Sequence, residues 1–190
     1  MGENFEMNYY GSKELAAAFR TVRNNTIQVA QDIPEDKYDF KPSPESRTVA
    51  QTLAHIANGT NFAQYLHGER IDDLAKLNFA ELMQKGAADE AKLRTKPEII
   101  AALKSNGDKY AAFLESLPES VLAERVAMPP GAEPASKSRF EMLLSPKEHE
   151  MHHRAQLMTI QRIVGVVPHL TRQRQETMAR ATAGNGQQHR

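Results

Sequence analysis

The longest helix expected in this chain lies within residues 138–165, SRFEMLLSPKEHEMHHRAQLMTIQRIVG. Two capping boxes fit its start, and we favour the earlier one, Ser138 with Glu141, over the later one at Ser145. The expected end is near Gly165, because glycine commonly terminates a helix. A helix of this length runs the full length of a helical bundle, so this segment favours a bundle fold.

The three histidines of the motif HEMHH do not share one face of this helix. At about 100° per residue, His149 and His153 lie about 40° apart, on either side of an apolar stripe that contains Met142 and Ile160. His152 falls about 60° away on the other side of His149. We therefore predict that His149 and His153 point into the bundle together, and that His152 does not belong to this pair.

Two inward imidazoles need polar partners, because an unsatisfied polar group in an apolar setting is costly. One divalent metal ion meets this need by taking a nitrogen from each ring, and a buried polar network without metal is the alternative. A third ligand must come from another helix. His55 shares a helix face with Phe62 and Leu66 and is predicted to point inward, although alone it would be taken for a core histidine.

The rest of the chain predicts three more long helices joined by irregular segments. They are expected at about residues 9–31, 48–67 and 95–118. A shorter helix is expected near 74–83, within a weakly patterned connection, and strand signals are scarce. The predicted fold class is therefore all-α: a four-helix bundle with long crossover connections.

The composition restricts the class of protein. The chain has 190 residues, no cysteine and a formal net charge of zero, which excludes disulfides, iron–sulfur clusters and a thiol nucleophile of its own. The balanced charge gives no reason to expect nucleic acid, and no segment is apolar enough to span a membrane. We expect one domain at residues 9–168, a leader at 1–8 that includes tag residues, and a polar, partly disordered tail at 169–190. No signal peptide is found, so the expected location is the cytoplasm.

The letters HEMHH also match two other metal motifs. In the H-E-x-x-H motif of zinc peptidases, the glutamate, here Glu150, activates a metal-bound water. The polar sequence downstream offers no well-placed third ligand, so a peptidase is a lesser alternative. Glu150 with His153 is also half of a di-iron bundle signature, but the residue three before His55 is Thr52 rather than an acid, and this interpretation fails.

Two segments resemble the DinB-like superfamily of damage-inducible four-helix bundles. They are PEDKYDFKPSPESRTVAQTLAHIANGT, residues 34–60, and HEMHHRAQL, residues 149–157. The resemblance covers about residues 9–165, and it departs from the usual H-x-x-x-H-R-G-Q pattern at Ala155, where glycine is usual. It implies that His55, His149 and His153 coordinate one divalent metal ion and leave positions open to water.

The resemblance implies a metal-dependent enzyme that acts on a small-molecule substrate. The expected activity is that of a hydrolase or of a thiol S-transferase that borrows an external low-molecular-weight thiol. Zinc, nickel and iron all suit imidazole ligands, so the identity of the metal stays open. The alternative is a non-enzymatic, stress-response metal-binding protein. A third hypothesis is a metal-free homodimer held by helix faces.

Several side chains are candidates for roles around the metal. Those expected to orient the ligands or the substrate are Glu150, Gln156 and Arg154. Gln156 is the strongest of them because it lies about 20° from His149, whereas the other two lie about 100° or more away and equally fit a face turned to solvent or to a partner subunit. Asn58 and Phe62, about one and two turns past His55, are candidates for the mouth of the pocket.

Overall fold

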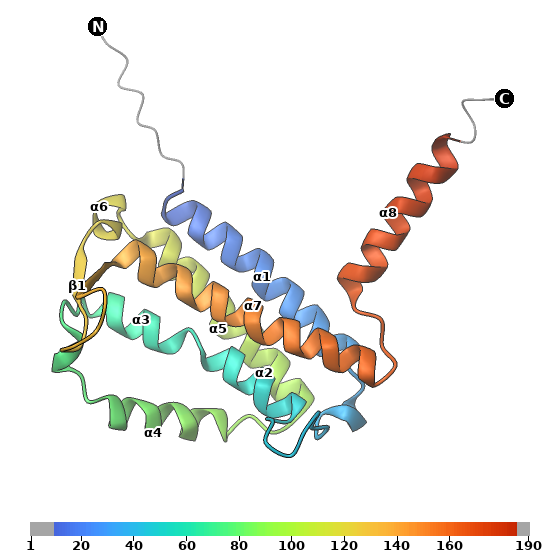
Figure 1. Ribbon diagram of the computed structural model, residues 1–190, viewed down its shortest axis with the longest axis horizontal. Coiled ribbons are helices and arrows are strands. Elements are labelled where there is room, and N and C mark those ends of the chain that lie inside the picture. Colours follow the sequence, from blue (N-terminus) through green and yellow to red (C-terminus); the bar gives the residue numbers. More distant parts are fainter. Residues whose placement is uncertain (1–9, 186–190) are drawn as a thin grey trace, which may run out of the picture.

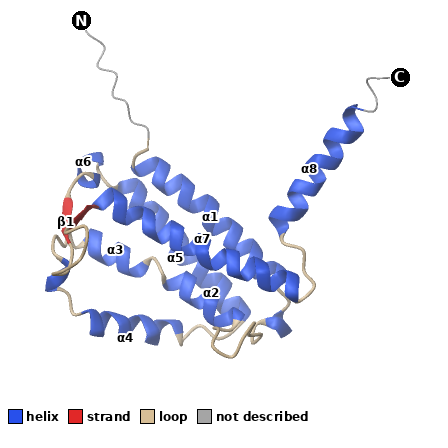
Figure 2. Cartoon of the chain, in the orientation of Figure 1, coloured by secondary structure: helices blue, strands red, loops and turns tan. Residues whose placement is uncertain are grey.

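The structure is a computed structural model that describes residues 10–185, so the predicted leader, residues 1–8, lies outside it. The elements in chain order are α1 (Ser12–Asp32), α2 (Val49–Asn58), α3 (Asn61–Gly68), α4 (Phe79–Glu90), α5 (Lys96–Ser116), α6 (Glu119–Leu122), β1 (Arg125–Ala127), β2 (Ser136–Ser138), α7 (Arg139–Ile163) and α8 (His169–Asn185). The two strands form a short antiparallel pair beside α6 (Figure 2). Helices dominate the described chain, as predicted.

The bundle consists of the long helices α1, α5 and α7 and of the two consecutive helices α2 and α3, which together take the fourth position (Figure 1). The helix α1 packs against α5 and α7, and α2 packs against the same two helices, so α1 and α2 occupy opposite corners. The chain therefore crosses the bundle diagonally between α1 and α2, and again between α5 and α7. Such crossings require the long connections predicted from the sequence, and the fold class is confirmed.

Side-chain caps fix where the bundle helices begin. The Thr95 hydroxyl accepts the backbone N–H of Glu98 at the start of α5, and the Ser138 hydroxyl accepts that of Glu141 at the start of α7. Each cap satisfies a backbone donor that has no partner within the helix. Both starts are those predicted, and Ser145 lies inside α7.

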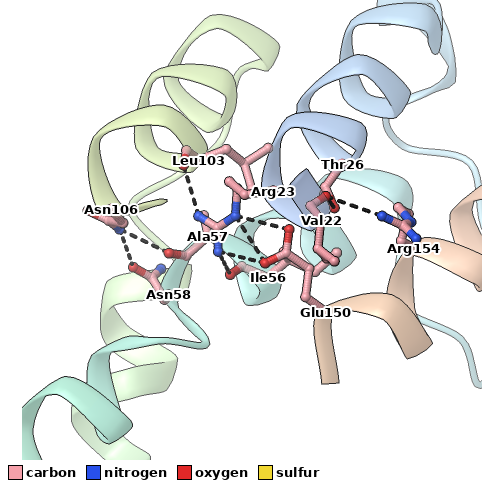
Figure 3. A network of polar contacts seen from close by, with 10 residues as sticks. All are labelled: Val22, Arg23, Thr26, Ile56, Ala57, Asn58, Leu103, Asn106, Glu150 and Arg154. Atoms are coloured by element: carbon pink, nitrogen blue, oxygen red, sulfur yellow. Dashed lines mark hydrogen bonds and ion pairs between the residues drawn. The ribbon is translucent and has the colours of Figure 1, made fainter. Parts of the chain in front are cut away.

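The predicted helix 48–67 is in fact broken into α2 and α3 at Gly59 and Thr60. Two carbonyl groups at the end of α2 accept hydrogen bonds from side chains of other helices. Nη2 of Arg23 donates to the Ile56 carbonyl at 3.2 Å, and Nδ2 of Asn106 donates to the Ala57 carbonyl at 3.0 Å (Figure 3). The break depends on tertiary contacts, which a sequence pattern does not contain.

The polar tail departs from expectation, because its residues 169–185 form the helix α8. This helix projects away from the bundle (Figure 1), and two side-chain contacts in its first turns anchor it to α1. Nε2 of His169 lies 3.1 Å from Oδ1 of Asn25, and Arg172 forms a 2.7 Å ion pair with Asp32. The predicted disorder at residues 186–190 lies outside the described residues.

A polar layer separates two apolar clusters along the bundle. One cluster contains Leu103 and Leu157, and the other contains Leu143 and Tyr110. The buried residues between them along α1 and α7 include Arg23 and Glu150.

None of the helices within residues 10–185 combines the length and the apolar character that a membrane-spanning helix requires.

Candidate metal centre

Three imidazole rings converge between α2 and α7. Nε2 of His149 lies 3.1 Å from Nε2 of His55 and 3.1 Å from Nε2 of His153. Each ring offers one ligand atom, and the three atoms all lie within 4.8 Å of one another, so the group is able to hold a metal ion. The structure thus brings together the three histidines singled out in the sequence.

The histidines lie at the edge of the buried face of α7 rather than at its centre. The centre of that face is formed by Leu143, Glu150 and Leu157, whereas His149 and His153 are half-buried and face α2. The helical wheel predicts that the buried face lies between the two histidines. The observed buried face is turned from that position by part of a turn, towards Glu150. The reason is that a charged residue, Glu150, occupies the core face, and a hydrophobicity pattern assigns such a residue to the surface.

Two side chains hold the outer nitrogens of the rings. Oε1 of Glu90 lies 2.7 Å from Nδ1 of His55, and Oε1 of Gln156 lies 2.9 Å from Nδ1 of His153. Both oxygens are acceptors, so Nδ1 of each ring carries the proton and Nε2 keeps its lone pair for a metal. Glu90 was missed in the sequence because it lies in the weakly patterned connection, where no periodicity marks it.

Gln156 was predicted to lie inward, but it is exposed. Its amide nitrogen lies 3.1 Å from Nε2 of His152, so the side chain spans His152 and His153 on the outer surface of α7. The predicted contact with the ligand set is therefore made from the solvent side. His152 is exposed and lies outside the ligand group, as the sequence predicted.

Burial favours the neutral form of His149 and of His153. It lowers the pKa of His149 to about 4, and repulsion from His153 and His55 adds to the effect. Burial also lowers the pKa of His153, although the bond to Gln156 opposes it. Neutral imidazole is the form that binds a metal.

The two separations measured from Nε2 of His149 fit nitrogens that bind one metal ion. Two nitrogens bonded to the same zinc ion at about 2.0–2.1 Å lie about 3.3–3.4 Å apart at a tetrahedral angle and about 2.9 Å apart at a right angle. The observed separations of 3.1 Å lie between these values. Lone pairs of His55 and His153 both face the single Nε2 of His149, and a cation placed among them would satisfy all three.

The glutamate of the H-E-x-x-H letters lies elsewhere. Glu150 is 2% exposed, and its two oxygens each lie 3.0 Å from Nε of Arg23 (Figure 3). Nη1 of Arg23 also donates to the Leu103 carbonyl at 2.8 Å. The carboxylate is thus committed to a buried ion pair, which removes the basis of the peptidase alternative. It also corrects the expectation that Glu150 faces solvent or a partner.

The remaining candidates take structural positions. Nη1 of Arg154 donates to the Val22 carbonyl at 3.3 Å, on the α1 side of α7 (Figure 3). Asn58 accepts bonds from Asn61 and Asn106 at the α2–α3 break. Phe62 is 39% exposed and contacts Phe79 of α4, with ring centroids 6.2 Å apart. A pocket role for Asn58 and Phe62 stays a prediction.

Gly59, at the α2–α3 break, closely approaches the site. A Cβ atom at this position would lie 3.3 Å from the His55 carbonyl oxygen and 3.4 Å from Nδ1 of His149. The break therefore lets the backbone of α2 pack directly against a ligand ring. A larger residue here would place its side chain against the His149 ring.

Fold and site together define the class: an all-α four-helix bundle with a three-histidine group able to hold one metal ion between two of its helices. The family model of the DinB superfamily matches residues 18–157, and the chain belongs to that family.

Similar proteins share the fold. YjoA of Bacillus subtilis, an uncharacterized protein, is 23% identical over 159 residues, which cover 81% of this chain and 91% of YjoA. Its crystal structure superposes with a TM-score of 0.59 over 80% of this chain and 92% of that one. A Streptococcus pneumoniae protein gives a TM-score of 0.63 at 20% identity, over 82% and 93% of the two chains.

YfiT from Bacillus subtilis is a further structural neighbour. It gives a TM-score of 0.61 at 16% identity, over 82% of this chain and 88% of that chain. It is described as "a probable metal-dependent hydrolase with an unusual four-helix bundle topology".

Proposed function

We propose that this chain binds one divalent metal ion through His55, His149 and His153 and is a metal-dependent hydrolase of small molecules. The observation that carries the proposal is the convergence of three imidazole rings, in which Nε2 of His149 lies 3.1 Å from Nε2 of His55 and 3.1 Å from Nε2 of His153. Nε2 of His149 carries at most one proton, so it can donate fully to only one of the two lone pairs that face it. An arrangement held in this way by Glu90 and Gln156 favours a cation as the missing partner.

The ligand set favours catalysis over a purely structural role. Structural zinc sites fill all four positions, commonly with cysteine, whereas three protein ligands leave a position for water or substrate. A bound divalent ion would supply Lewis-acid chemistry, lowering the pKa of a water ligand to about 7 and polarising a substrate oxygen. Hydrolysis is the preferred reaction because YfiT, which shares the fold, is described as "a probable metal-dependent hydrolase".

The residues of this chain have defined roles in the proposal. Glu90 and Gln156 hold the Nδ1 protons of His55 and His153, so that both Nε2 atoms face the ion. His149 stays neutral because burial lowers its pKa. His55 is 21% exposed, so the group is reached from solvent and a small substrate can approach it.

A thiol S-transferase is the second candidate. The chain has no cysteine, so the thiol would have to come from a second, low-molecular-weight substrate that the ion binds as thiolate. Zinc, nickel or iron would serve either reaction, since imidazole binds all three. The two candidates differ in one requirement, because only the transferase needs added thiol.

The test compares metal-stripped protein with protein reloaded with one equivalent of zinc, nickel or iron. A panel of small ester, amide and phosphoester substrates should be hydrolysed by the loaded form alone, and the H149A variant should be inactive. The matched control is H152A, which removes a histidine of the same helix and should retain activity. Turnover that appears only when a thiol is added favours the transferase. A loaded protein inert toward both panels favours the non-enzymatic, stress-response metal-binding alternative and contradicts the hydrolase proposal.

A further inference from the structure

The helix α4 is attached to the bundle in an unusual way. It runs alongside α2 and α3 on the outside of the bundle (Figure 1). The structure describes every residue of α4, and none of them is buried. Its first residue, Phe79, contacts the exposed ring of Phe62, and its last residue, Glu90, bonds His55. The end of α4 is therefore held in part by a polar contact to one of the three histidine rings.

Weak apolar packing makes α4 a segment that opens at low cost. Elements with few buried apolar contacts separate from the rest of a fold well before the fold unfolds. Phe79 and Met83 are 40% and 72% exposed and Leu82 is half-buried, so no apolar side chain of this helix is fully buried. The bond from His55 to Glu90, at 2.7 Å with 28% exposure of the Glu90 side chain, is better shielded from solvent than the ion pair of Asp89 with Lys92.

We propose that Glu90 is a positioning residue for the metal centre and that, through it, metal binding and the docking of α4 stabilise each other. This inference rests on the proposed function, because it requires that His55 bind a metal. Glu90 accepts the Nδ1 proton of His55, which fixes the tautomer and the ring plane that present Nε2 to the ion.

The coupling runs in both directions. An ion bound at Nε2 withdraws electron density from the ring, so the Nδ1–H group becomes a stronger donor to the carboxylate. The negative charge of Glu90 in turn partly offsets the double charge of an ion held by neutral ligands. Linkage requires that the effect of α4 docking on metal affinity equal the effect of metal on α4 docking.

The first test measures zinc affinity by chelator competition for E90Q and for D89N. Both variants remove one negative charge from the last turn of α4, but Asp89 pairs with Lys92 rather than with a histidine, at 2.6 Å. E90Q should raise the Kd for zinc about 10- to 100-fold, the range for loss of a carboxylate that holds a ligand histidine. D89N should stay close to the wild type.

The second test measures backbone amide hydrogen exchange in α4 with and without zinc. Zinc should slow exchange in α4 of the wild type and of D89N, and should do so much less in E90Q. Equal zinc affinity of E90Q and D89N, or α4 exchange that zinc leaves unchanged in the wild type, would overturn the inference. Wild-type protein that binds no zinc at all is a distinct result, because it refutes the proposed function itself and the inference with it.

Discussion

Replacing Glu150 with alanine should destabilise the protein severely without removing its metal ligands. Arg23 and Glu150 are 3% and 2% exposed, and Nη2 of Arg23 lies 2.9 Å from Oε2 of Glu150. Without the carboxylate, the Arg23 guanidinium keeps its bonds to the Leu103 and Ile56 carbonyls but becomes a buried charge with no counter-ion. Breaking a buried ion pair from one side costs about 3–5 kcal/mol.

This cost is a large part of the total, since a folded domain is stable by about 5–15 kcal/mol. Urea unfolding of metal-free protein, followed by circular dichroism, measures the change as a lower midpoint with little change in slope. The matched control is E148A, which removes an exposed acid of the same helix and should shift stability by less than about 0.5 kcal/mol.

A loss below about 1 kcal/mol in E150A would refute the assignment of Glu150 to a buried ion pair. A second variant tests the physical reason. Replacing both partners, as R23M with E150L, removes the lone buried charge and should recover much of the stability lost in E150A. If the double variant is as unstable as E150A, the uncompensated charge is not the cause.

Three further outcomes follow from the structure. G107A should lower the Tm, because a Cβ there would lie 2.7 Å from Cγ of Arg23. Overpacking costs about 1–3 kcal/mol, whereas the gain in helix propensity is at most about 1 kcal/mol. A higher Tm would contradict the close approach of Arg23 to Gly107. Burial lowers the pKa of His67 to about 4, below its value of about 6.5 in the unfolded chain. Neutral His67 therefore contributes up to about 3 kcal/mol to the free energy of unfolding above pH 6.5, and this contribution is lost as the pH falls towards 4. Urea midpoints across this range should fall less steeply in H67Q, and an unchanged slope would refute this origin. Stripping the metal should leave the helical circular dichroism intact, with zinc at about 100 times its Kd adding back about 2.7 kcal/mol of stability; loss of helix on stripping would show instead that the ion is structural.

The ligand group could be predicted from the sequence in parts of unequal strength. His149 and His153 are one helical turn apart, a spacing that brings two rings together whichever way the helix faces. That is why the two rings meet, as predicted, although α7 is turned by part of a turn from the predicted orientation. His55 depends on how α2 packs against α7, and the family resemblance rather than the local pattern singled it out.

The contacts that tune the site could not be predicted. Glu90 comes from a helix with no buried face, so no periodicity signals where it docks. The Arg23–Glu150 pair joins residues 127 apart in the sequence, and each of them reads locally as a surface charge. The helix break at Gly59 likewise depends on Asn106 and Arg23, which arrive from two other helices.

The same reasoning explains the success with helix starts and the failure with the tail. The capping box at Thr95 and the hydroxyl cap at Ser138 are satisfied within four residues, so the sequence contains all of the relevant interactions. The helix α8 has no apolar face that a pattern could detect. Its first turns are anchored by Asn25 and Asp32 of α1, which are distant in the sequence.

Zinc stoichiometry tests the three-histidine centre most directly. Titration of metal-stripped protein with zinc, followed by isothermal calorimetry, should show one ion per chain for the wild type and for H152A. The H55A, H149A and H153A variants, checked for intact helical circular dichroism, should each lose this binding. One ion per chain in H149A, with the affinity of the wild type, would contradict a site built on the three converging Nε2 atoms.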